Sequence, residues 1–530
     1  MLTFIYGLLD RFPWIVRLVA RIPFLRRFFS DLYINLQAYS ALARPLPYSM
    51  AESYTTWKSL TDKTFTGRHL PEAQDMPELP PIDKVVELWR RKNNQEIPSA
   101  DTSMLFSFFA QWFTDSFLRT NLLDRRKNTS NHEIDLCQIY GLNEEMTNCL
   151  RLKTDGKLKY QIINGEVYPP YLFDVEKTTA DNWVFASKEF ETLHPRYALD
   201  FICRGVPEER LKYMFAVGLE HGNSAIGYTI LNTIMLREHN RICDLLKASY
   251  PDWSGNDERL FQTARNIMIV LLIKIVIGDY IGQFSRLDFN LDPTPGKAEK
   301  QTWYRTNWIS LEFNLLYRWH SMVPENFFIG NETLPLNDIR SNTPLVALYG
   351  VGPLIDAASR QRAGQIGLHN TPGIFFEPMP FGPDNRSVME RTVAMGRDAK
   401  LRSFNDYREA FSYPRLTSFA ELTDDVELRE ELRQLYRDRI DDLEWHVGIF
   451  AEKADPSFML GRLLTRMVGY DAFTHALTNP LMATAVHNEM TFSNVGFALI
   501  SEPVSIADII HRNIRDRDKV AASFTTAAQR

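Results

Sequence analysis

The sequence predicts a mainly α-helical protein in which one large domain, residues 66–530, follows short amphipathic helices within residues 1–65. From residue 103 onward, apolar residues recur with helical spacing, and residues that cap helices stand at the ends of these stretches. Alternating strand patterns are almost absent from the same region. The first 45 residues differ, because apolar and aromatic side chains alternate there with arginines and two prolines divide the stretch.

The N-terminal stretch is typical of helices that lie in a membrane interface. Its arginines and helix-interrupting prolines are Arg11, Arg17, Arg21, Arg26, Arg27, Pro13 and Pro23. In such a position apolar rings enter the acyl boundary while guanidinium groups meet lipid phosphates, which predicts monotopic membrane binding. The alternative is that these helices pack on the body of the same protein.

A looser region rich in proline and acidic residues, from about Thr66 to Pro81, links these helices to the body. Helical spacing then predicts helices over 103–120, 206–248 in several pieces, 257–285, 301–321, 341–363, 386–402 and 424–438. The one convincing strand pair is Leu158–Ile163 with Glu166–Tyr168, joined by Asn164-Gly165, a dipeptide that favours a tight hairpin turn.

Composition and charge limit the classes of function. With 530 residues, of which 45% are hydrophobic and 24% charged, the chain can build a large core. A net charge of −6 argues against a nucleic-acid partner. The four cysteines show no zinc-site spacing, and their scarcity fits a reducing compartment, so we expect a position at the cytoplasmic face of a membrane. No stretch has the roughly 20 uninterrupted apolar residues of a spanning helix, and Ile267–Ile273 is expected in a buried helix.

The strongest local candidate for chemistry is FNLLYRWHSMVPENF, residues 313–327. Tyr317 and His320 stand three apart on the predicted helix and would share one face of it. A neutral imidazole is a standard axial ligand for haem iron, and a phenol near haem can be oxidised to a tyrosyl radical. The alternative is core packing, since Tyr and His are often buried with their polar tips satisfied.

A second candidate is MLFSFFAQWFTDSFLRT, residues 104–120, where Gln111 and Asp115 stand four apart on an apolar helix and so point the same way. A carboxylate on an apolar face is costly unless it is paired or catalytic. The alternative is an Asp satisfied by a core hydrogen bond or at a helix end. His221, in VGLEHGNSAIGY, precedes another helix, and the local sequence alone favours a surface loop residue.

These segments belong to a longer series that resembles the animal prostaglandin synthases, or cyclooxygenases, of the animal haem peroxidase superfamily. The resemblance runs from about residue 7 to 500 and is carried by FFAQWFTDSFLRT, HEIDLCQIYGLNEE, RLKTDGKLKYQIINGEVYPP, LREHNRICDLLKASYPDW, EFNLLYRWHSMVPENF, ASRQRAGQIG and LRSFNDYREAF. It implies the helical fold of that superfamily, a haem b cofactor (iron protoporphyrin IX), monotopic membrane-binding helices and a homodimer.

The resemblance also implies roles for single residues. His320 matches the proximal ligand of the haem iron, and Tyr317 matches the radical-forming tyrosine. Trp319 matches the tryptophan between them, and Tyr280 matches the tyrosine that hydrogen-bonds the radical residue. Gln111 matches the distal glutamine over the haem.

The chain departs from the family pattern on the distal side. Asp115 replaces the family's distal histidine, which moves a proton between the peroxide oxygens, and such general acid–base catalysis contributes roughly 10²–10⁴-fold in rate. His221 stands where the cyclooxygenases carry an apolar residue. We hypothesise that Asp115 and His221 together replace the missing group. The alternative is weak peroxidase activity, with Asp115 a solvated pocket residue.

The residues at the mouth of the substrate site differ as well. The arginine and tyrosine that bind the fatty-acid carboxylate in cyclooxygenases fall at Ala38 and Leu287 by gapless counting. Arg44 and Arg286 lie nearby in the sequence and are candidates for a bidentate guanidinium partner of the carboxylate. The alternative is that both are surface arginines.

The expected function is haem-dependent dioxygenation of a polyunsaturated fatty acid by O₂ through a tyrosyl radical, giving a hydroperoxide, with cyclisation left open. One alternative is α-dioxygenase-like oxygenation beside the carboxylate, because YRWHSMVPE also resembles that branch. Another is a haem- or lipid-binding protein that has lost turnover. The expected partners are the fatty acid, O₂ and a membrane surface.

Overall fold

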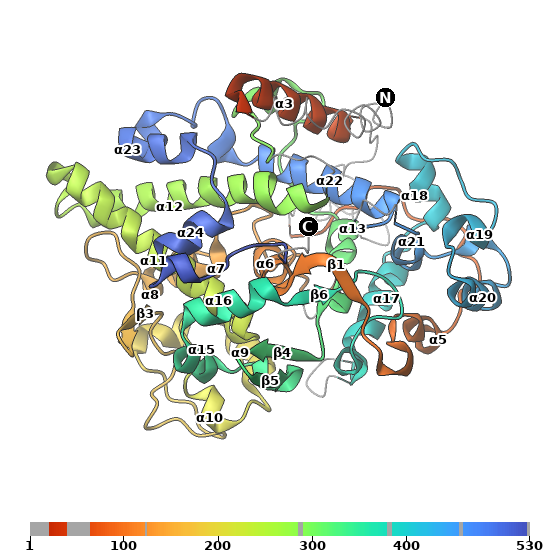
Figure 1. Cartoon of the computed structure of the whole chain (residues 1–530), viewed down its shortest axis with the longest axis horizontal. Coiled ribbons are helices and arrows are strands. Elements are labelled where there is room, and N and C mark those ends of the chain that lie inside the picture. The colour runs from red at the N-terminus through yellow and green to blue at the C-terminus, as the bar shows by residue number, and fades with distance from the viewer. Residues whose placement is uncertain are drawn as a thin grey trace.

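The computed structural model describes residues 21–39, 64–121, 124–284, 290–378, 384–454 and 459–526. In these ranges the protein is mainly helical, which confirms the predicted fold class. Figure 1 shows long helices through the middle of the molecule, with shorter helices and loops around them. The strands of the described ranges form three two-stranded sheets.

The helices of the first half of the chain are α3 Pro23–Tyr39, α5 Ile82–Val86, α6 Met104–Thr114, α7 Cys137–Tyr140, α8 Glu144–Leu150, α9 Arg196–Cys203, α10 Glu208–Leu211, α11 Ile226–Ser249 and α12 Asp257–Ile275. The second half contains α13 Leu311–Leu316, α14 Leu336–Ile339, α15 Thr343–Tyr349, α16 Val351–Arg360, α17 Val388–Asp398, α18 Phe404–Ala410, α19 Phe419–Leu422, α20 Val426–Leu435, α21 Trp445–Ala451, α22 Arg462–Leu477, α23 Glu489–Ser501 and α24 Ile506–Arg512. The shorter turns that bear on the site are η1 Glu87–Trp89, η4 Glu220–Asn223, the π-helical η6 Val276–Tyr280, η7 Ile281–Phe284 and η9 His320–Met322.

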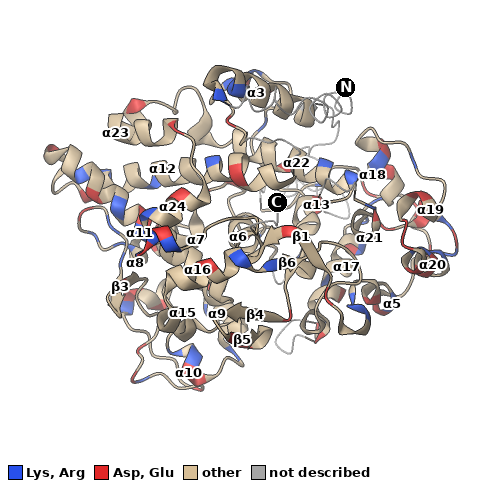
Figure 2. Ribbon diagram, viewed as in Figure 1, with Lys and Arg blue, Asp and Glu red and all other residues tan. Residues whose placement is uncertain are grey.

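The core lies between the central helices. α11 packs against both α6 and α12, while α22 packs against α13 and against η6 and η7, which continue α12. Helix α6 is the most apolar of these, and Phe106, Phe109 and Trp112 are fully buried on it. Burying side chains of this size stabilises the fold by roughly 1.5–3 kcal/mol each. Charged residues of both signs are instead dispersed over the outer elements (Figure 2).

The helix predicted over 103–120 ends earlier than expected, at Thr114. The side chain of Ser103 caps its start by accepting a hydrogen bond from Phe106 N. Beyond the helix, Phe117 O accepts hydrogen bonds from the side chains of Asn128 (2.6 Å) and Ser130 (3.0 Å). These tertiary hydrogen bonds hold the chain after Thr114 against the loop at 128–130, and Asp115 is the C-cap residue of the shortened helix.

The prediction of one helix over 301–321 is wrong. α13 begins only at Leu311, where Ser310 caps it by accepting a hydrogen bond from Phe313 N (2.9 Å). Ile309 N donates to His132 Nδ1 (3.0 Å), which holds the residues before the helix against a distant loop. The helix then ends at Leu316. Tertiary hydrogen bonds override the local helical pattern here.

The other predicted helices are present, although several are divided. Gly350 has a φ of 82° and separates α15 from α16 within 341–363. The stretch 206–248 contains α10, η4 and α11, and 257–285 contains α12 with η6 and η7. The predictions over 386–402 and 424–438 are confirmed by α17, which begins with a capping box, and by α20.

The predicted hairpin is confirmed. β2 Gln161–Ile163 pairs with β3 Glu166–Tyr168 in antiparallel register. Asn164 (φ 51°) and Gly165 (φ 77°) both adopt the left-handed backbone conformation that a type I′ turn requires.

The expectation of a single strand pair is wrong. β4 Asn326–Ile329 forms a second hairpin with β5 Glu332–Pro335, and β1 Pro98–Ser103 pairs with β6 Arg362–Gly364. β1 and β6 are so far apart in the sequence that no local pattern could reveal their pairing.

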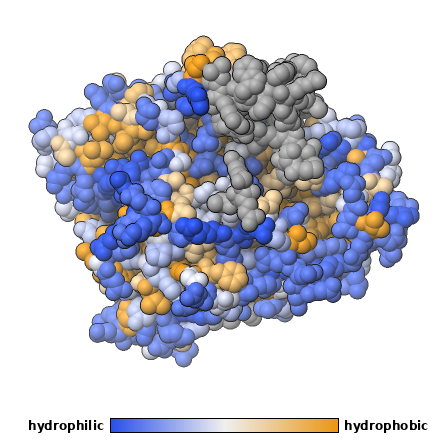
Figure 3. All heavy atoms as spheres, viewed as in Figure 1, coloured by the Kyte–Doolittle hydropathy of each residue, from blue (hydrophilic) through white to orange (hydrophobic). Residues whose placement is uncertain are grey.

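Helix α3 lies at one edge of the molecule and has two different faces. One face packs on α22, and Arg26 donates to Asp292 (3.0 Å). The other face exposes aromatic side chains, among them Phe24 (75%) and Phe28 (49%). Figure 3 shows apolar surface over α3 and over the neighbouring α23. The rest of the predicted N-terminal helices, residues 1–20 and 40–63, lies outside the described residues.

One continuous helix among the described residues, α12 with its continuation to Phe284, is long and apolar enough to cross a membrane. Most of it is buried inside the protein, as expected for Ile267–Ile273. The pair α23 and α24 passes the same test only when both are counted together across a bend of 108°. The four cysteines are buried and free.

Candidate active site

The chain leaves the helix between Tyr317 and His320. α13 ends at Leu316, Tyr317 and Trp319 have ψ angles of 15° and 45°, and His320 begins η9. The prediction that one helix face carries Tyr317 and His320 is therefore wrong. The bend buries Trp319 in the core instead.

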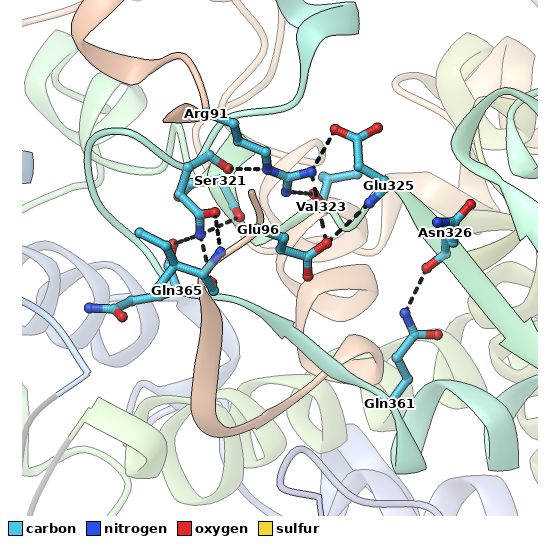
Figure 4. A network of polar contacts seen from close by, with 10 residues as sticks. Arg91, Glu96, Ser321, Val323, Glu325, Asn326, Gln361 and Gln365 are labelled. Atoms are coloured by element: carbon cyan, nitrogen blue, oxygen red, sulfur yellow. Dashed lines mark hydrogen bonds and ion pairs between the residues drawn. The ribbon is translucent and has the colours of Figure 1, made fainter. Parts of the chain in front are cut away.

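A polar network centred on the buried side chain of Arg91 holds the chain that follows His320 (Figure 4). Arg91 donates to Val323 O (2.7 Å), to Asn370 O (3.0 Å) and to the carboxylate of Glu325 (2.7 Å). Because a guanidinium makes strong, directional hydrogen bonds, this network fixes the backbone that positions the imidazole of His320.

His320 has the properties of an axial haem ligand. Burial, together with the guanidinium of Arg318, lowers the pKa of its imidazole to about 3, so the ring is neutral. Its Nδ1 atom is buried with no hydrogen-bond partner among the described residues, and the ring stacks on Phe375 with centroids 4.6 Å apart.

The residues present fit a haem better than a bare metal ion. Within the described parts of the chain, no group of three or more His, Cys, Asp or Glu side chains could hold an ion. A haem iron needs only one neutral imidazole on this side, because the porphyrin supplies its in-plane nitrogens. His320 is therefore the candidate ligand.

Tyr317 lies in an aromatic cluster with Tyr280. The rings of Tyr317 and Trp319 have centroids 4.5 Å apart, and Phe106 stacks on Trp319 (6.4 Å) and on Tyr280 (4.8 Å). Burial raises the pKa of Tyr317, while the Tyr280 hydroxyl directed toward it lowers that pKa. The two hydroxyls are directed toward each other, and neither has another partner among the described residues.

A π-helical turn places Tyr280 in this cluster. η6 follows α12 directly and ends at Tyr280, and it packs against α22. A π turn rotates the residues after it relative to a regular helix, and such turns are frequent at functional sites. The apolar spacing of the sequence predicts a helix here but not this local change of pitch.

Gln111 and Asp115 lie at the end of α6. Gln111 is exposed, and its Nε2 lies 3.5 Å from Ser224 Oγ. Burial raises the pKa of Asp115, although the nearby charges of His221, Arg119 and Arg318 lower it. Asp115 is thus a half-buried carboxylate close to several cationic groups.

His221 belongs to the same cluster as Asp115. It lies on η4, its side chain is 36% exposed, and its Nδ1 is 3.3 Å from Glu220 Oε1. Burial acts to lower the pKa of His221, but the Glu220 carboxylate and then Asp115 outweigh it and raise that pKa above its ordinary value. The charges of His221 and Asp115 thus affect each other's pKa, and the joint role of the two residues stays a prediction.

Sequence reasoning missed the residues that support this pair. Arg119 donates to Glu220 (2.6 Å), and both side chains are 10% exposed. Burial alone would raise the pKa of Glu220, but His221 and Arg119 hold it far below its ordinary value. The available signals were that Arg119 stands four residues after Asp115 and that Glu220 is adjacent to His221.

Two further residues act on the Tyr317–His320 segment and were also missed. Arg318 interacts electrostatically with both Asp115 and His320 and so connects the two halves of the site. Asp471, on α22, raises the pKa of Tyr317, and its carboxylate lies 2.9 Å from His69 Nε2. Asp471 gave no sequence signal, because only the fold brings α22 to α13.

The predicted carboxylate-binding residues cannot be placed in the site. Arg44 and Arg286 both lie outside the described residues. Their role in binding a fatty acid stays a prediction.

Comparison with known proteins defines the class. The model of the animal haem peroxidase family matches residues 124–524, and the chain belongs to this family. Prostaglandin G/H synthase 1 of Rattus norvegicus is 34% identical over 515 residues, which cover 94% of this chain and 79% of that protein. Prostaglandin G/H synthase 2 of Equus caballus is 32% identical over 528 residues, covering 96% and 80%.

Solved structures agree on the fold. The fatty acid alpha-dioxygenase of Arabidopsis thaliana has a TM-score of 0.71 at 18% identity and covers 96% of this chain and 90% of its own. Peroxidase A from Dictyostelium discoideum has a TM-score of 0.66 at 17% identity, with coverages of 92% and 96%. The predicted family and fold are confirmed, and the roles of the individual site residues remain predictions.

Proposed function

We propose that the protein is a haem-dependent oxidoreductase that adds O₂ to a polyunsaturated fatty acid through a radical on Tyr317, giving a hydroperoxide. Membership of the animal haem peroxidase family supports the cofactor. Identity of 32–34% to prostaglandin G/H synthases supports the class of reaction. The observation that carries the proposal is the buried Tyr317 hydroxyl, three residues before His320 and facing Tyr280.

In this proposal Nε2 of His320 holds the iron of haem b. When bound, the haem supplies a one-electron oxidation driven by peroxide. Tyr317 gives up an electron and its hydroxyl proton and becomes a phenoxyl radical. That radical takes a hydrogen atom from a fatty-acid carbon between two double bonds, which restores the phenol and leaves a carbon radical.

O₂ then adds to the carbon radical and forms a peroxyl radical. The peroxyl radical takes a hydrogen atom from Tyr317, which releases the hydroperoxide and regenerates the phenoxyl radical. One fatty acid and one O₂ thus give one hydroperoxide. The rings of Trp319 and Phe313 pack against Tyr317 and help to exclude water from the phenoxyl group, and the Tyr280 hydroxyl, which faces Tyr317, would stabilise it.

The peroxide that starts the cycle needs a proton acceptor and donor on the distal side. We propose that Asp115 and His221 share this role, because the structure couples their charges and anchors His221 on Glu220. The test is to replace each by Ala and measure the rate at which peroxide oxidises the bound haem. If His221→Ala leaves that rate unchanged, the proposal that the two residues share this role is wrong. The remaining alternative is then weak peroxidase activity.

We also propose that α3 rests on a membrane surface, at the cytoplasmic face. Phe24, Phe28 and Phe29 are 75%, 49% and 41% exposed on a helix that also carries arginines. Exposed rings beside guanidinium groups suit the boundary between acyl chains and lipid phosphates.

A second candidate function is oxygenation beside the carboxylate. The fold similarity to the fatty acid alpha-dioxygenases of Arabidopsis thaliana and Oryza sativa favours it as the alternative. Both functions use the same Tyr317–His320 segment, so they differ in how the fatty acid lies against Tyr317. The position of the added oxygen distinguishes them.

The proposal is tested by measuring O₂ uptake by haem-reconstituted protein with a panel of C18 and C20 fatty acids. The products are then identified by mass spectrometry. We expect O₂ uptake with polyunsaturated acids and hydroperoxides oxygenated within the chain. Products oxygenated at the carbon next to the carboxylate would support the second candidate. A normal haem spectrum with no O₂ uptake would support a haem- or lipid-binding protein, and uptake that survives Tyr317→Phe would refute the radical role.

A further inference from the structure

Helix α23 exposes apolar side chains at the same edge of the molecule as α3 (Figure 1). No charged residue lies between Met490 and Ser501, and Met490 is 97% exposed. Ala498 is exposed as well, while Phe497 and Leu499 are half-buried. Figure 3 shows the resulting apolar surface over α23, beside that of α3. A contiguous exposed apolar patch is a mark of contact with another molecule or with a membrane.

The opposite face of α23 is packed tightly on α12. A Cβ atom added at Gly496 would lie 2.4 Å from Cδ1 of Ile267, so the two helices touch at this glycine. Ile500 stands four residues after Gly496, on the same face, and is 2% exposed. Ser493, with a φ of 62°, breaks the helix before this packed part, and Met490 belongs to the turn ahead of the break. The packing of α23 on the body therefore holds its apolar face outward.

Ion pairs and hydrogen bonds join the end of α23 to α3. Asp292 accepts a hydrogen bond from Arg26 of α3 (3.0 Å), and its other carboxylate oxygen lies 3.9 Å from Nζ of Lys274. Lys274 in turn donates to the carbonyl oxygens of Ile500 (2.7 Å) and Glu502 (2.8 Å), where α23 ends. Through these contacts the apolar surfaces of the two helices become parts of one edge of the protein.

The chemistry of this edge fits a lipid bilayer. α3 combines the exposed rings of Phe24 and Phe28 with the exposed guanidinium of Arg21, as a helix at the boundary between acyl chains and phosphates does. α23 and α24 together have the length and apolar composition of a membrane span, but the bend of 108° between them prevents a straight crossing. An apolar helix of this kind can lie in the membrane surface.

A second copy of the chain fits the same surface less well. Glu489 and Glu502 stand at the two ends of α23, and both are exposed. A two-fold contact through α23 would bring these carboxylates of one chain against those of the other, and facing like charges oppose association. A zwitterionic bilayer carries no net charge and so lacks this repulsion.

We propose that α23 is a second lipid-contacting element, and that Met490 enters the boundary of the acyl chains when the protein lies on a bilayer. This inference rests on the membrane contact proposed for α3 and deepens it. Contact at α3 alone would leave the protein free to tilt, whereas contacts at both helices define which edge faces the lipid. The arginines of α3 meet lipid phosphates, and α23, which carries no cation, adds apolar contact.

The test follows the environment of a fluorophore at position 490 in the full-length, haem-reconstituted protein. Met490→Cys introduces an exposed thiol for a bimane label, and the four native cysteines are buried, so labelling is selective. On phosphatidylcholine vesicles we expect a blue shift of the bimane emission, and a loss of that emission when the acyl chains are brominated. Leu348→Cys, labelled in the same way, is the matched control, because Leu348 is 71% exposed on α15, away from α3 in Figure 1. The label in this control should show neither change.

The strength of vesicle binding gives a second measure that needs no label. Met490→Ser should weaken binding about tenfold, because the variant loses the burial of an apolar side chain in lipid. The loss should be the same on phosphatidylcholine vesicles and on vesicles that also contain phosphatidylserine, since α23 contributes no cation. Leu348→Ser should bind as tightly as the wild type.

Unchanged bimane emission in vesicle-bound protein, or wild-type affinity of Met490→Ser, overturns the inference and leaves the contact at α3 standing. Insertion of the label, together with undiminished binding when Phe24 and Phe28 are replaced by Ser, keeps the contact at α23 and refutes the one at α3. A blue shift that grows with protein concentration in the absence of vesicles would mean that a second copy covers α23, which overturns the inference. If the wild type binds neither kind of vesicle, both membrane proposals are wrong.

Discussion

At the scale of single residues, the site depends on pairs whose members modify one another. Tyr317 has a hydroxyl that is buried and faces Tyr280, and His221 is anchored on Glu220. In both pairs the neighbour shifts the pKa of the residue that we propose to react. Each pair can therefore be tested by changing only the neighbour.

Tyr280→Phe removes the hydroxyl that faces Tyr317. Because one hydrogen bond contributes about 1 kcal/mol, we expect the oxygenation rate to fall roughly fivefold while haem binding is retained. The measurement is the initial rate of O₂ uptake at saturating fatty acid. Tyr140→Phe is the control, since it removes a buried hydroxyl that bonds His239 (2.8 Å), and the Tyr140 ring packs on His239 and Phe261 instead of on the rings of this cluster. An equal loss of rate in both variants would argue against a specific role for Tyr280.

Glu220→Gln tests the charge on His221 through the pH profile. Glu220 raises the pKa of His221, so in the wild type the imidazole keeps its proton above its ordinary pKa of about 6.5. A peroxidase step that needs neutral His221 as a base then rises with pH around that raised value. In Glu220→Gln only burial and the remaining charges act on the pKa of His221. The peroxidase rate should therefore rise at a lower pH than in the wild type.

The profile is measured as the rate of peroxide-driven oxidation of a reductant at saturating haem. Glu238→Gln provides the control, because Glu238 is fully buried and, like Glu220, is paired with an arginine, Arg241 (2.7 Å). Glu238→Gln should leave the pH at which the peroxidase rate rises unchanged. A profile that is the same in Glu220→Gln and the wild type would exclude His221 as the titrating base.

At the scale of elements, the helical pattern of the sequence predicts where most helices lie but not where they break. The spacing over 301–321 indicates one helix, whereas hydrogen bonds from distant loops restrict α13 to Leu311–Leu316. The break matters because it buries Trp319 and starts a new turn at His320. The hairpin at Asn164-Gly165 was predictable, since its signal is local, and the pairing of β1 with β6 was not.

In the candidate site, too, some residues could be predicted from the local sequence and others only from the fold. Gln111 and Asp115 were predictable as neighbours because both lie on one short helix. The contribution of Asp471 was not, because it reaches Tyr317 only through the packing of α22 on α13.

Gly364→Ala tests whether β6 positions the segment after His320. A Cβ atom at Gly364 would lie 2.1 Å from the carbonyl oxygen of Ser321, so the backbone next to His320 must move. Overpacking of this kind costs about 1–3 kcal/mol. We expect a lower thermal unfolding midpoint and loss of haem during gel filtration.

Gly352→Ala is the matched control for this change. Gly352 lies in α16, and an added Cβ atom would meet Val520 at 3.5 Å, an ordinary contact. Replacing a helical glycine by alanine without strain stabilises by about 0.4–1 kcal/mol. Unchanged stability and haem retention in Gly364→Ala would show that the Ser321 backbone does not depend on this close contact.

At the scale of the whole molecule, α3 exposes an apolar surface whose contact with water is unfavourable, so this surface needs an explanation. Phe24 and Phe28 point away from the body, while Arg26 is paired with Asp292 beneath them. One face of α3 packs on the protein, as the alternative reading of the sequence expects, and contact of the other face with lipid stays a proposal.

Replacing Phe24 and Phe28 together with Ser should weaken binding to vesicles that contain anionic lipid by tenfold or more. Each ring that enters the acyl boundary contributes roughly 1.5–3 kcal/mol, and 1.4 kcal/mol corresponds to tenfold. Co-sedimentation with vesicles measures the change. Tyr197→Ser is the control, because Tyr197 is 61% exposed on α9, away from α3 in Figure 1. Equal binding by the double variant and the wild type would place the membrane contact elsewhere.

The central claim is that a haem held by His320 generates a radical on Tyr317. The most direct measurement is electron paramagnetic resonance on haem-reconstituted protein frozen within milliseconds of mixing with peroxide, compared between the wild type and Tyr317→Phe. We predict a tyrosyl radical in the wild type and the loss of that signal, together with fatty-acid oxygenation, in Tyr317→Phe. The same radical signal in Tyr317→Phe, accompanied by undiminished O₂ uptake, would contradict the claim.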